Sequence, residues 1–562
     1  RFRRENAAGT TQEGKIMKRK AVAAVLTAVM VASMFTGCGS DNGSSSAKSA
    51  SAASAASAAN DTVDEDGKVN GIMYQEGLPL VDEGDYTFSI FCDDSSESGE
   101  FIMLDEFKKQ TNVDVDLKIY PYETATERLN LDLNSGDYAD VIGGWTLSDN
   151  AILTYGVNQG VFIPLEDYFE KYCPNISAIL DLPGVREKMT APDGHIYTIP
   201  YVCTDTTVGY SPYINTKWLE NVGMSMPTTT DEFEAVLKAF KEQDANGNGD
   251  ASDEIPFSTD PNNKHIEAMA GYFGLPMNKL GIAIQNEKVV YGGVSDTYRE
   301  FLSWFHKLYA EGLVDVELYT QDSSTWEGKG NQDLYGVSIA YGSNEFTGIP
   351  AAEERGDFDS MPVLNTDKDG IWLRDTEGFS VYRTQAVITN KAEHPEIICR
   401  WFDNAFALEN GIGCNRGPVG VIVNKEDDGY HAIDTTTLSE EDQEKYSWGN
   451  LWPQSLPKYL PVDFEFVEAH PMYDEKKATE EAYEANLTKE IIPSYWIDLD
   501  KIDTFSDTNT AIKDFFEQQQ AQFVCGELDI DNDADWQAYV DGMYSLGLED
   551  WVATQGIEEI AK

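Results

Sequence analysis

Beyond residue 85, hydrophobic positions alternate between the spacing of strands and the spacing of helices. Residues 86–90 alternate apolar and polar side chains, 101–107 place apolar side chains at helical spacing, and 113–119 alternate again. A second amphipathic segment runs to Gly136, and a short apolar run over 139–145 follows it. Because strands separated by helices pair in parallel with helices on both faces, this pattern predicts an α/β fold.

Three later segments predict helices with marked ends. Thr229 and Glu232 have the spacing of a capping box ahead of an apolar helical face. A continuous apolar face over 298–309 ends near Gly312, and Pro395 fits the first turn of another helix. The sequence shows no internal repeat. We therefore expect the chain to pass back and forth between the lobes of one continuous fold.

A strongly apolar stretch near the start of the sequence predicts export. Basic residues at 18–20 precede an apolar run over 21–35, which is shorter than the roughly 20 residues of a membrane-spanning helix. The tetrapeptide FTGC at 35–38 resembles the lipobox of bacterial lipoproteins, with Phe where Leu is usual. We therefore expect a lipid on Cys38. The alternative is an ordinary secretory signal with an incidental cysteine.

The segments on either side of Cys38 are expected to lie outside the fold. Residues 1–16 precede the signal and look like an upstream extension, so 1–37 is assigned to extension and signal peptide. Residues 39–60 are rich in Ser, Ala and Gly without hydrophobic periodicity, which is typical of a flexible linker. We predict that 38–84 is a lipid-anchored flexible tether.

Composition narrows the class of protein further. The 562 residues include 98 acidic and 41 basic side chains, for a formal charge of −57 at pH 7. A charge of this sign repels polyanions, so we expect no nucleic-acid partner. The length suggests roughly two to four domains, and 41% hydrophobic residues provide a large core. The six cysteines after Cys38 have no metal-binding spacing, so free thiols are expected and one disulfide stays open.

Motifs that would indicate an enzyme are missing from the sequence. It contains no GxSxG, HExxH, GxxxxGK[ST] or GxGxxG motif, and none of its 6 His residues is followed by another at i+4. A pair of carboxylates of the glycosidase type remains compatible with so acidic a chain. We predict a protein without catalytic activity, and a surface glycoside hydrolase is the alternative.

An acidic loop at 244–254, DANGNGDASDE, has the alternating oxygen donors that Ca²⁺ requires. Gly249 stands at the sixth position, where an EF-hand loop turns sharply, but the twelfth position is Ile255, which cannot bind metal. Donors that are all oxygen favour Ca²⁺ over zinc. We predict a structural calcium site, with a polar turn as the alternative. Its candidate ligands are Asp244, Asn246, Asn248, Asp250, and either Asp253 or Glu254.

Tryptophan is frequent at predicted strand ends and loops, namely at Trp145, Trp372, Trp448 and Trp452. An indole face packs against the C–H groups of a sugar ring while neighbouring polar groups bind the hydroxyls. This surplus predicts a carbohydrate site. For each single Trp, packing in the core is the alternative.

Several segments follow the predicted lipobox and tether in a recognisable order. They are LDEFKKQTNVDVDL, LNSGDYADVIGGW, GVFIPLEDYFEKYCPNI, APDGHIYTIPY, INTKWLENVGMSMPTTTDEFEAVLKAF, the acidic loop with DEIPF, LYAEGLVDVELYTQD, NKAEHPEIICRWFDNAF and WQAYVDGMYSLGLEDWVATQ. In this order, over 85–555, they resemble the extracellular solute-binding lipoproteins of carbohydrate ABC importers (family 1), in the long form of Gram-positive bacteria.

The resemblance implies a two-lobed, periplasmic-binding-protein-like fold of type II, with a ligand cleft between the lobes. The first lobe is expected at 85–205 with 360–410, and the second at 206–359 with 411–562. It also implies a mono- or oligosaccharide ligand, delivered to a permease pair that a cytoplasmic ATPase drives. Longer members of the family carry a calcium loop, although Asp253 and Glu254 stand one residue later here than in that pattern.

We therefore predict a lipid-anchored monomer on the outer face of a Gram-positive cell, capturing a carbohydrate for an ABC importer. A sugar sensor or adhesin without transport is a further alternative. Trp145 follows ADVIGG at the carboxyl end of a strand, where open α/β sheets bind ligands. Arg374 or Arg383 offers a partner for a ligand carboxylate. The expected ligand-binding residues are Trp145, Asp205, Tyr210, Tyr341, Trp372, Arg374, Trp448 and Trp452.

Overall fold

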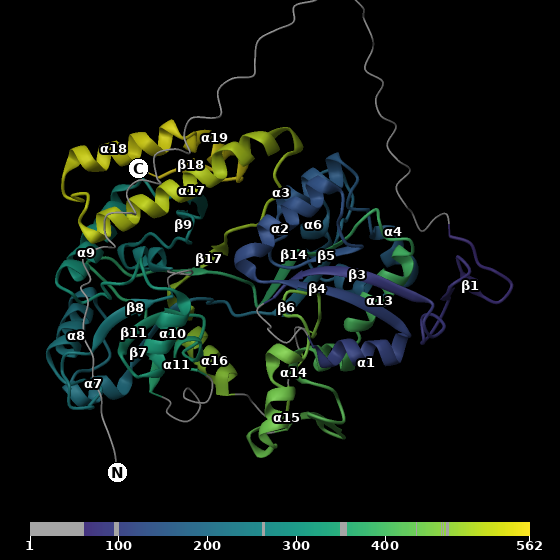
Figure 1. Cartoon of the computed structure of the whole chain (residues 1–562). Helices are drawn as coiled ribbons and strands as arrows, with labels where there is room; N and C mark the ends of the chain where they lie inside the picture. Colours follow the sequence, from purple (N-terminus) through teal and green to yellow (C-terminus); the bar gives the residue numbers. More distant parts are fainter. Residues whose placement is uncertain are drawn as a thin grey trace, which may run out of the picture. The chain divides into compact units, whose positions relative to one another are not determined.

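The computed structural model describes residues 61–94, 100–260, 265–348, 357–433, 435–461, 464, 466–467 and 471–561. All of them belong to one compact unit, Ala53–Lys562, which two sheets organise (Figure 1). The predicted signal peptide and Cys38 lie outside the described residues. Among the described helices, none has the length and apolar character needed to cross a membrane.

The first sheet combines strands from distant parts of the sequence. β3 (Tyr86–Asp93) pairs in parallel with β4 (Val113–Tyr120) and with β5 (Val141–Gly143). β14 (Phe379–Ile388) runs antiparallel to β5 and to β6 (Thr198–Thr204). The sheet is therefore mixed. The parallel pairing predicted from the alternation of strands and helices is confirmed for β3, β4 and β5, and β14, which returns from a distant part of the chain, adds the antiparallel pairs.

Helices pack on the first sheet and complete its core, and we call sheet and helices together the first lobe. The core joins Phe88 and Ile90 of β3 to Trp401 and Phe402, which lie on the helix that Pro395 begins, as predicted. The helices of this lobe are α1 (Ile102–Thr111), α2 (Tyr122–Ser135), α3 (Asp149–Ala151), α4 (Glu166–Tyr172), α5 (Pro174–Leu180), α6 (Val185–Met189), α13 (Pro395–Ala405) and α14 (Leu408–Arg416).

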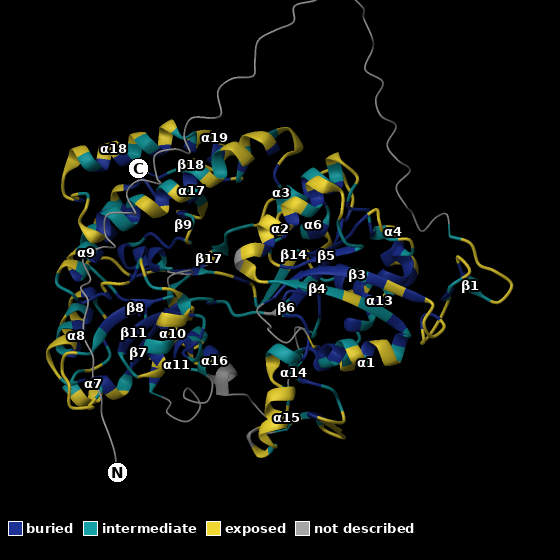
Figure 2. Cartoon of the chain, in the orientation of Figure 1, coloured by how far each residue is buried: buried dark blue, intermediate teal, exposed yellow. Residues whose placement is uncertain are grey.

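A second sheet forms the centre of the other lobe. Its strands are ordered β12 (Phe358–Ser360), β7 (Ser211–Asn215), β11 (Tyr335–Ala340) and β8 (Ile255–Thr259), with β11 parallel to β8 and antiparallel to β7. A smaller sheet joins β9 (Ile282–Gln285), β10 (Lys288–Tyr291) and β18 (Glu559–Ile560). Figure 2 shows the strands β8 and β11 in the colour of buried residues.

Helices also surround the second sheet, and the predicted capping residue Thr229 explains where one of them begins. In α8 (Thr230–Glu242), the N-terminal cap is Thr229, whose hydroxyl oxygen accepts a bond of 3.2 Å from the Glu232 amide. α9 (Asp296–Ala310) carries the predicted apolar face. The other helices of this lobe are α7 (Thr216–Val222), α10 (Ser323–Asn331), α11 (Asn344–Thr347), α16 (Pro471–Tyr483), α17 (Ile502–Cys525), α18 (Asp533–Ser545) and α19 (Leu548–Thr554).

Within the described residues, the chain reaches across the boundary between the lobes at three places, and it passes from the first lobe to the second once more between Tyr459 and α16. The first crossing joins β6 to β7, and the second joins β13 (Trp372–Arg374) to β14. The third follows β17 (Leu487–Ile491), which pairs with β13. Along it, the Trp496 indole donates to the Lys188 carbonyl of the first lobe at 2.9 Å before α17 returns to the second lobe. The crossings bring residues of both lobes close together.

Two predicted lobe boundaries are wrong. Residues 360–378 were expected in the first lobe, but Met361, Leu364 and Trp372 pack in the core of the second. Residues after 410 were expected in the second lobe, but Trp452 and Leu456 pack in the core of the first. Apolar side chains close to a crossing pack against whichever core is nearer, and hydrophobic spacing alone does not indicate which one that is.

The predicted tether is also too long. Residues 61–84 contain β1 (Lys68–Val69) and β2 (Met73–Tyr74), and Val69, Met73, Leu80 and Val81 are buried in the core of the first lobe. The Leu80 amide donates to the Thr111 carbonyl of α1 at 2.9 Å. These isolated apolar residues in a polar segment attach it to the fold, so only 38–60, which lies outside the described residues, remains a predicted tether.

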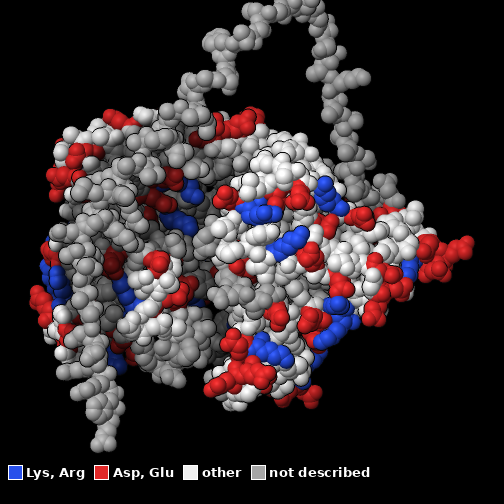
Figure 3. All heavy atoms as spheres, in the orientation of Figure 1, with Lys and Arg blue, Asp and Glu red and all other residues white. Residues whose placement is uncertain are grey.

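The surface agrees with the acidic composition. Figure 3 shows Asp and Glu side chains scattered over one face of the molecule, with Lys and Arg among them. A hairpin of β15 (Val423–Glu426) and β16 (Gly429–Ala432) and the short helix α15 (Glu440–Lys445) extend from the first lobe. The six cysteines after Cys38 are free thiols, as expected, and of these Cys525 is exposed.

Candidate functional site

The loop after β5 presents Trp145 at the carboxyl end of the first sheet. Asp93, the last residue of β3, accepts hydrogen bonds from the amides of Trp145 at 3.0 Å and Thr146 at 2.6 Å. Gly144 has φ +131°, and a Cβ there would lie 2.3 Å from the Asp93 carboxylate, so only glycine allows this close approach. The bonds hold the backbone while the Trp145 side chain stays 45% exposed.

Three aromatic rings from three segments of the first lobe meet here. The Trp145 ring lies 5.3 Å from that of Tyr382 on β14 and 6.4 Å from that of Tyr201 on β6, in edge-to-face contacts. Tyr201 and Tyr382 stack on each other at 5.5 Å. We call Trp145, Tyr201 and Tyr382 the aromatic wall. Because Trp145 and Tyr382 remain partly exposed, the wall offers apolar ring surface that is not used in packing.

A buried cation lies behind the aromatic wall. The Lys458 ammonium is 5.7 Å from the centre of the Tyr201 ring and 5.5 Å from that of Trp448. Burial lowers its pKa to about 8. Trp448 is 55% exposed, so Lys458 connects the wall to a further exposed indole.

Asp205, in the first crossing, joins the two lobes. Its carboxylate accepts from the Ser380 hydroxyl of β14 at 2.6 Å and from the Tyr382 hydroxyl at 3.5 Å. On the side of the second lobe, the hydroxyl of Tyr341, which follows β11, donates to Asp205 at 3.2 Å. Asp205 thus lies in the first crossing and Tyr341 directly after the strand β11, and a hydrogen bond joins these two expected ligand-binding residues. A polar group that holds hydroxyls from both lobes is suited to hydroxyl-rich ligands.

On the second-lobe side of the site, Tyr341 lies next to a second aromatic residue, Tyr210. Tyr210 lies 6.1 Å from the Tyr341 ring and stacks on His265 at 3.9 Å. Burial lowers the pKa of His265 to about 4, so this imidazole is neutral at physiological pH and offers a flat, uncharged face. The Lys476 ammonium stands 3.7 Å from the centre of the Tyr341 ring and donates to the Gly209 carbonyl at 2.8 Å.

Three of the expected ligand-binding residues make structural contacts. Trp372 is buried in the core of the second lobe, against Tyr483 at 5.5 Å. Trp452 is fully buried in the first lobe and stacks on Trp401 at 5.7 Å. Arg374 donates to the Thr488 carbonyl at 3.2 Å and so ties β13 to β17. The prediction of Trp372 and Trp452 as ligand surfaces is wrong, because neighbouring strands and helices cover both indoles.

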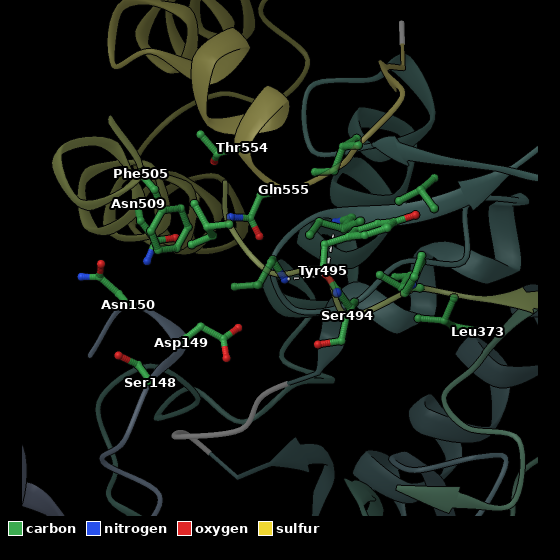
Figure 4. Close-up of a pocket in the computed structure, with 18 of the residues that line it drawn as sticks. Ser148, Asp149, Asn150, Leu373, Ser494, Tyr495, Phe505, Asn509, Thr554 and Gln555 are labelled. Atoms are coloured by element: carbon green, nitrogen blue, oxygen red, sulfur yellow. Dashed lines mark hydrogen bonds between the residues drawn. The ribbon is translucent and has the colours of Figure 1, made fainter. Parts of the chain in front are cut away.

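A separate cavity of about 660 Å³ lies beside the third crossing. Figure 4 shows Asp149 and Asn150 of the first lobe on one side of it, and Asn509 and Gln555 of the second on the other. Asp149 there pairs with Arg383 at 2.5 Å. Trp145, Tyr341 and Tyr382 are not among the residues that line this cavity. The aromatic wall and the cavity are therefore two different features of the region between the lobes.

The acidic loop follows α8 and carries two buried carboxylate oxygens without a hydrogen-bond partner, Asp244 Oδ1 and Glu254 Oε2. Burial raises the pKa of Glu254. The Asp253 oxygens accept from the side-chain amides of Asn246 and Asn248, at 3.3 and 2.8 Å. Gly249 has φ +94°, as a sharp turn requires. The unpartnered oxygens fit a bound cation, since a buried carboxylate oxygen without a donor is costly.

The other side-chain oxygens of the loop that could bind a cation accept hydrogen bonds within the loop. The Asn248 side-chain oxygen accepts from the Asp250 amide at 2.8 Å, and Asp250 Oδ1 accepts from the Ser252 hydroxyl at 2.6 Å. Within the described residues, three His, Cys or carboxylate ligand atoms converge within 4.8 Å only at Glu426, Asp428 and His431, on the exposed hairpin. A cation in the acidic loop would therefore need asparagine and backbone oxygens in addition to the carboxylates.

The sequence pattern that defines bacterial extracellular solute-binding proteins matches residues 94–411. The chain belongs to this family. It is 28% identical to the fructooligosaccharide ABC transporter substrate-binding protein FusA of Streptococcus pneumoniae serotype 4, in an alignment that covers 94% of this chain and 96% of FusA.

Solved structures of solute-binding proteins share the fold. The structure of FusA in complex with kestose has a TM-score of 0.73 at 27% identity, covering 84% of this chain and 98% of that one. An EF-hand mutant of FusA in complex with fructo-nystose gives 0.72 at 27% identity, with the same coverage. The alginate-binding protein AlgQ2 without calcium ion gives 0.69 at 23% identity, covering 86% of this chain and 99% of that one.

Membership of the family confirms several predictions from the sequence. The two-lobed fold of type II is confirmed by these solved structures. Solute-binding proteins are not enzymes, so the expectation of a protein without catalytic activity is confirmed and the surface glycoside hydrolase is set aside. The family is extracellular by its description.

Sequence reasoning missed three members of the site: Tyr201, Tyr382 and Lys476. Tyr382 and Ser380 alternate on β14, so they lie on one face of the strand, and that signal was present in the sequence FSVYR. Tyr201 begins the segment YVCTD at the first crossing, where aromatic residues near a hinge favour a ligand site. Nothing in the helix pattern of α16 distinguishes Lys476 from its neighbour Lys477.

Proposed function

We propose that this solute-binding protein is the substrate-binding component of an ABC importer and that it captures a carbohydrate between the aromatic wall and Tyr341. The observation that carries the proposal is the exposed ring surface of Trp145 and Tyr382 beside the shared acceptor Asp205. Rings and hydroxyl-binding acceptors together are what sugar recognition requires. The similarity to FusA over nearly the whole chain supports an oligosaccharide and suggests fructooligosaccharides as the first ligands to test.

The test is a calorimetric and thermal-shift screen with kestose, nystose and unrelated oligosaccharides. A saturable signal with one group of sugars is expected, and Trp145→Ala should weaken it with the fold intact. Tyr544→Ala is the matched control, since Tyr544 is an exposed aromatic residue on α18. Absence of binding to every sugar, or equal binding by Trp145→Ala, would overturn the proposal. Loss of sugar uptake on deleting the gene would separate an importer component from a sensor.

We propose in addition that Cys38 carries a lipid and that 38–60 tethers the binding protein to the outer face of the membrane. The basis is the sequence alone: basic residues, an apolar run and the FTGC junction at 35–38. The expected result for Cys38→Ala is loss from the membrane fraction, with protein in the medium or an uncleaved precursor. Correct processing and retention of this variant in the membrane would contradict the anchor.

The acidic loop is proposed to bind Ca²⁺ for structural reasons. Asp244 and Glu254 would each supply a carboxylate with one buried, unpartnered oxygen, Asn246 and Asn248 side-chain oxygens, and Asp250 its backbone carbonyl. The unpartnered oxygens of Asp244 and Glu254 support this, and so does the existence of an EF-hand in FusA. EDTA should lower the melting temperature, and Asp244→Ala should abolish the EDTA effect. An unchanged melting curve with no copurifying metal would leave the loop a polar turn.

A further inference from the structure

Five carboxylates gather on the second-lobe side of the proposed sugar site, and we call them the carboxylate cluster. Glu345 accepts from the Tyr341 amide at 2.9 Å, and Asp205 accepts from the Tyr341 hydroxyl at 3.2 Å. Asp375 accepts from the Gly209 amide at 2.7 Å. Two further members lie on α16: Glu475, which accepts from the Ser343 hydroxyl at 2.6 Å, and Glu480, which accepts from the Thr207 amide at 2.6 Å.

A single lysine of the described residues stands among these carboxylates. Lys476 is close enough to Asp205, Glu345, Asp375 and Glu475 for each of them to raise its pKa, although burial is the larger effect and lowers the pKa to about 8. Its ammonium already donates to the Gly209 carbonyl at 2.8 Å and contacts the Tyr341 ring. One cation against five carboxylates leaves the second-lobe side of the site with an excess of negative charge.

The two arginines that the sequence offered as partners for a ligand carboxylate are both engaged. Arg383 is buried, pairs with Asp149 at 2.5 Å and donates to the carbonyls of Ser494 at 3.2 Å and Tyr495 at 2.7 Å. Its guanidinium also stacks over Trp496 at 4.2 Å. Arg374 donates to the Thr488 carbonyl and lies 3.7 Å from Glu484.

Lys458, on the first-lobe side, is also engaged. Its ammonium donates to the side-chain oxygen of Gln454, and the side chain is almost completely buried behind Tyr201. Lys458, Lys476, Arg374 and Arg383 are thus each held by carbonyls, carboxylates or rings. A sugar carboxylate entering there would face the carboxylate cluster without a guanidinium to pair with.

We propose that the site selects neutral oligosaccharides and rejects sugars that carry carboxylate groups. This inference rests on the proposed function. Neutral hydroxyls donate well to carboxylates, whereas a charged sugar meets repulsion that a site of low dielectric strengthens. The fold alone does not determine whether neutral or charged sugars bind, since AlgQ2, named as a binding protein for the carboxylate-bearing polysaccharide alginate, has the same fold.

A matched pair of ligands tests the inference. Kestose is compared with kestose whose primary hydroxymethyl groups have been oxidised to carboxylates, by calorimetry at neutral pH and low salt. Galactotriose and trigalacturonate form a second pair that differs in the same way. In whichever pair the neutral sugar binds, the charged partner should bind at least about tenfold more weakly, because like charges within about 10 Å each weaken binding severalfold.

Comparable or tighter binding of a charged sugar would overturn the inference and leave the proposed function standing. Absence of binding by any oligosaccharide in the screen would overturn the proposed function, and the inference with it. The two failures are therefore distinguishable. Ligands too weak for calorimetry can be compared by thermal shift at high concentration, so that the relative affinities of the charged sugars are still measured.

A variant removes charge without removing acceptors. In the double variant Glu345→Gln with Glu480→Gln, each side-chain carbonyl oxygen can still accept from the amide that the glutamate accepts from now. The ratio of neutral to charged affinity should fall about threefold to tenfold. Glu549→Gln, on the exposed first turn of α19, is the matched control and should leave the ratio unchanged. An unchanged ratio in the double variant would refute the role of the carboxylate cluster.

Discussion

Trp145 and Trp452 both belong to the first lobe, but one lies in an exposed loop and the other in the core. Trp145 lies at the end of the first sheet, where Asp93 binds its backbone amide and Tyr382 contacts its ring, and it stays 45% exposed. Trp452 is fully buried, stacked on Trp401 and 5.1 Å from the Phe107 ring. The exposed indole of Trp145 is available to a ligand and contributes little to stability. The buried indole of Trp452 stabilises the fold of the lobe.

The difference lies in what surrounds each indole. Trp145 follows two glycines at a strand end, and the rings of Tyr201 and Tyr382 cover its indole only in part. Trp452 follows Leu451, whose carbonyl accepts from the Met103 amide of α1, and this contact draws the segment onto the first lobe. Substitutions at the two positions should therefore separate stability from binding, and the four predictions that follow run from the largest expected effect to the smallest.

The largest effect is expected for Trp452→Ala. Removing a fully buried indole leaves a cavity and should lower the free energy of unfolding by about 3–5 kcal/mol. Chemical denaturation followed by circular dichroism measures this change. Sugar affinity of the remaining folded protein should change little, because Trp452 does not face the proposed site. A loss of affinity without a loss of stability would place Trp452 back among the ligand-binding residues.

Trp145→Ala should have the opposite signature. Loss of a stacking indole should cost about 1–3 kcal/mol of binding free energy, or roughly tenfold to a hundredfold in affinity. The free energy of unfolding should stay within about 0.5 kcal/mol of the parent, as for other exposed positions. Calorimetry on the sugar identified in the screen, with Tyr544→Ala as control, measures the first, and denaturation measures the second. Equal loss of both would show that Trp145 is a core residue.

A site residue can be predicted from the sequence when its position depends on the short segment around it, and not when it depends on contacts with distant segments. Trp145, Asp205 and Tyr341 were predicted because strand ends and crossings can be recognised from short segments. Trp372 and Trp452 could not be assigned correctly, since their burial results from β17 and α13, which are distant in the sequence. For the same reason, the pairing of β14 with β5 and β6 was missed. Short-range hydrophobic spacing predicts elements, whereas the neighbours of an element depend on the whole chain.

Lys458→Met tests the buried cation between these two regions. Burial lowers the folded-state pKa of Lys458 from 10.5 to about 8, so the unfolded chain binds its proton more tightly than the folded one. Below pH about 8 the full cost of the buried charge is present, and it diminishes as the pH rises towards 10.5. Lys458→Met should therefore stabilise the protein by about 1–2 kcal/mol at neutral pH.

That gain should shrink between about pH 8 and 10.5, which denaturation at several pH values measures against the parent protein. Lys477→Met is the control, because Lys477 is an exposed lysine on α16. A stabilisation that is independent of pH would mean that methionine packs better there for reasons unrelated to charge. Destabilisation would mean that the bond to Gln454 and the contacts with Tyr201 and Trp448 outweigh the cost of burial.

The smallest effect concerns the hydroxyl that Tyr341 donates to Asp205 across the two lobes, at 3.2 Å. Neither partner is fully buried, so removing the bond should cost only about 0.5–1.5 kcal/mol of unfolding free energy. A double-mutant cycle of Tyr341→Phe and Asp205→Asn isolates the pair, since each single variant also affects other bonds of Asp205. The coupling energy should fall in the same range, and Ser380→Ala with Tyr341→Phe should couple more weakly because those residues share Asp205 without contact. A coupling of zero for the first pair would mean that the crossing alone, and not this hydrogen bond, holds the second lobe against the aromatic wall.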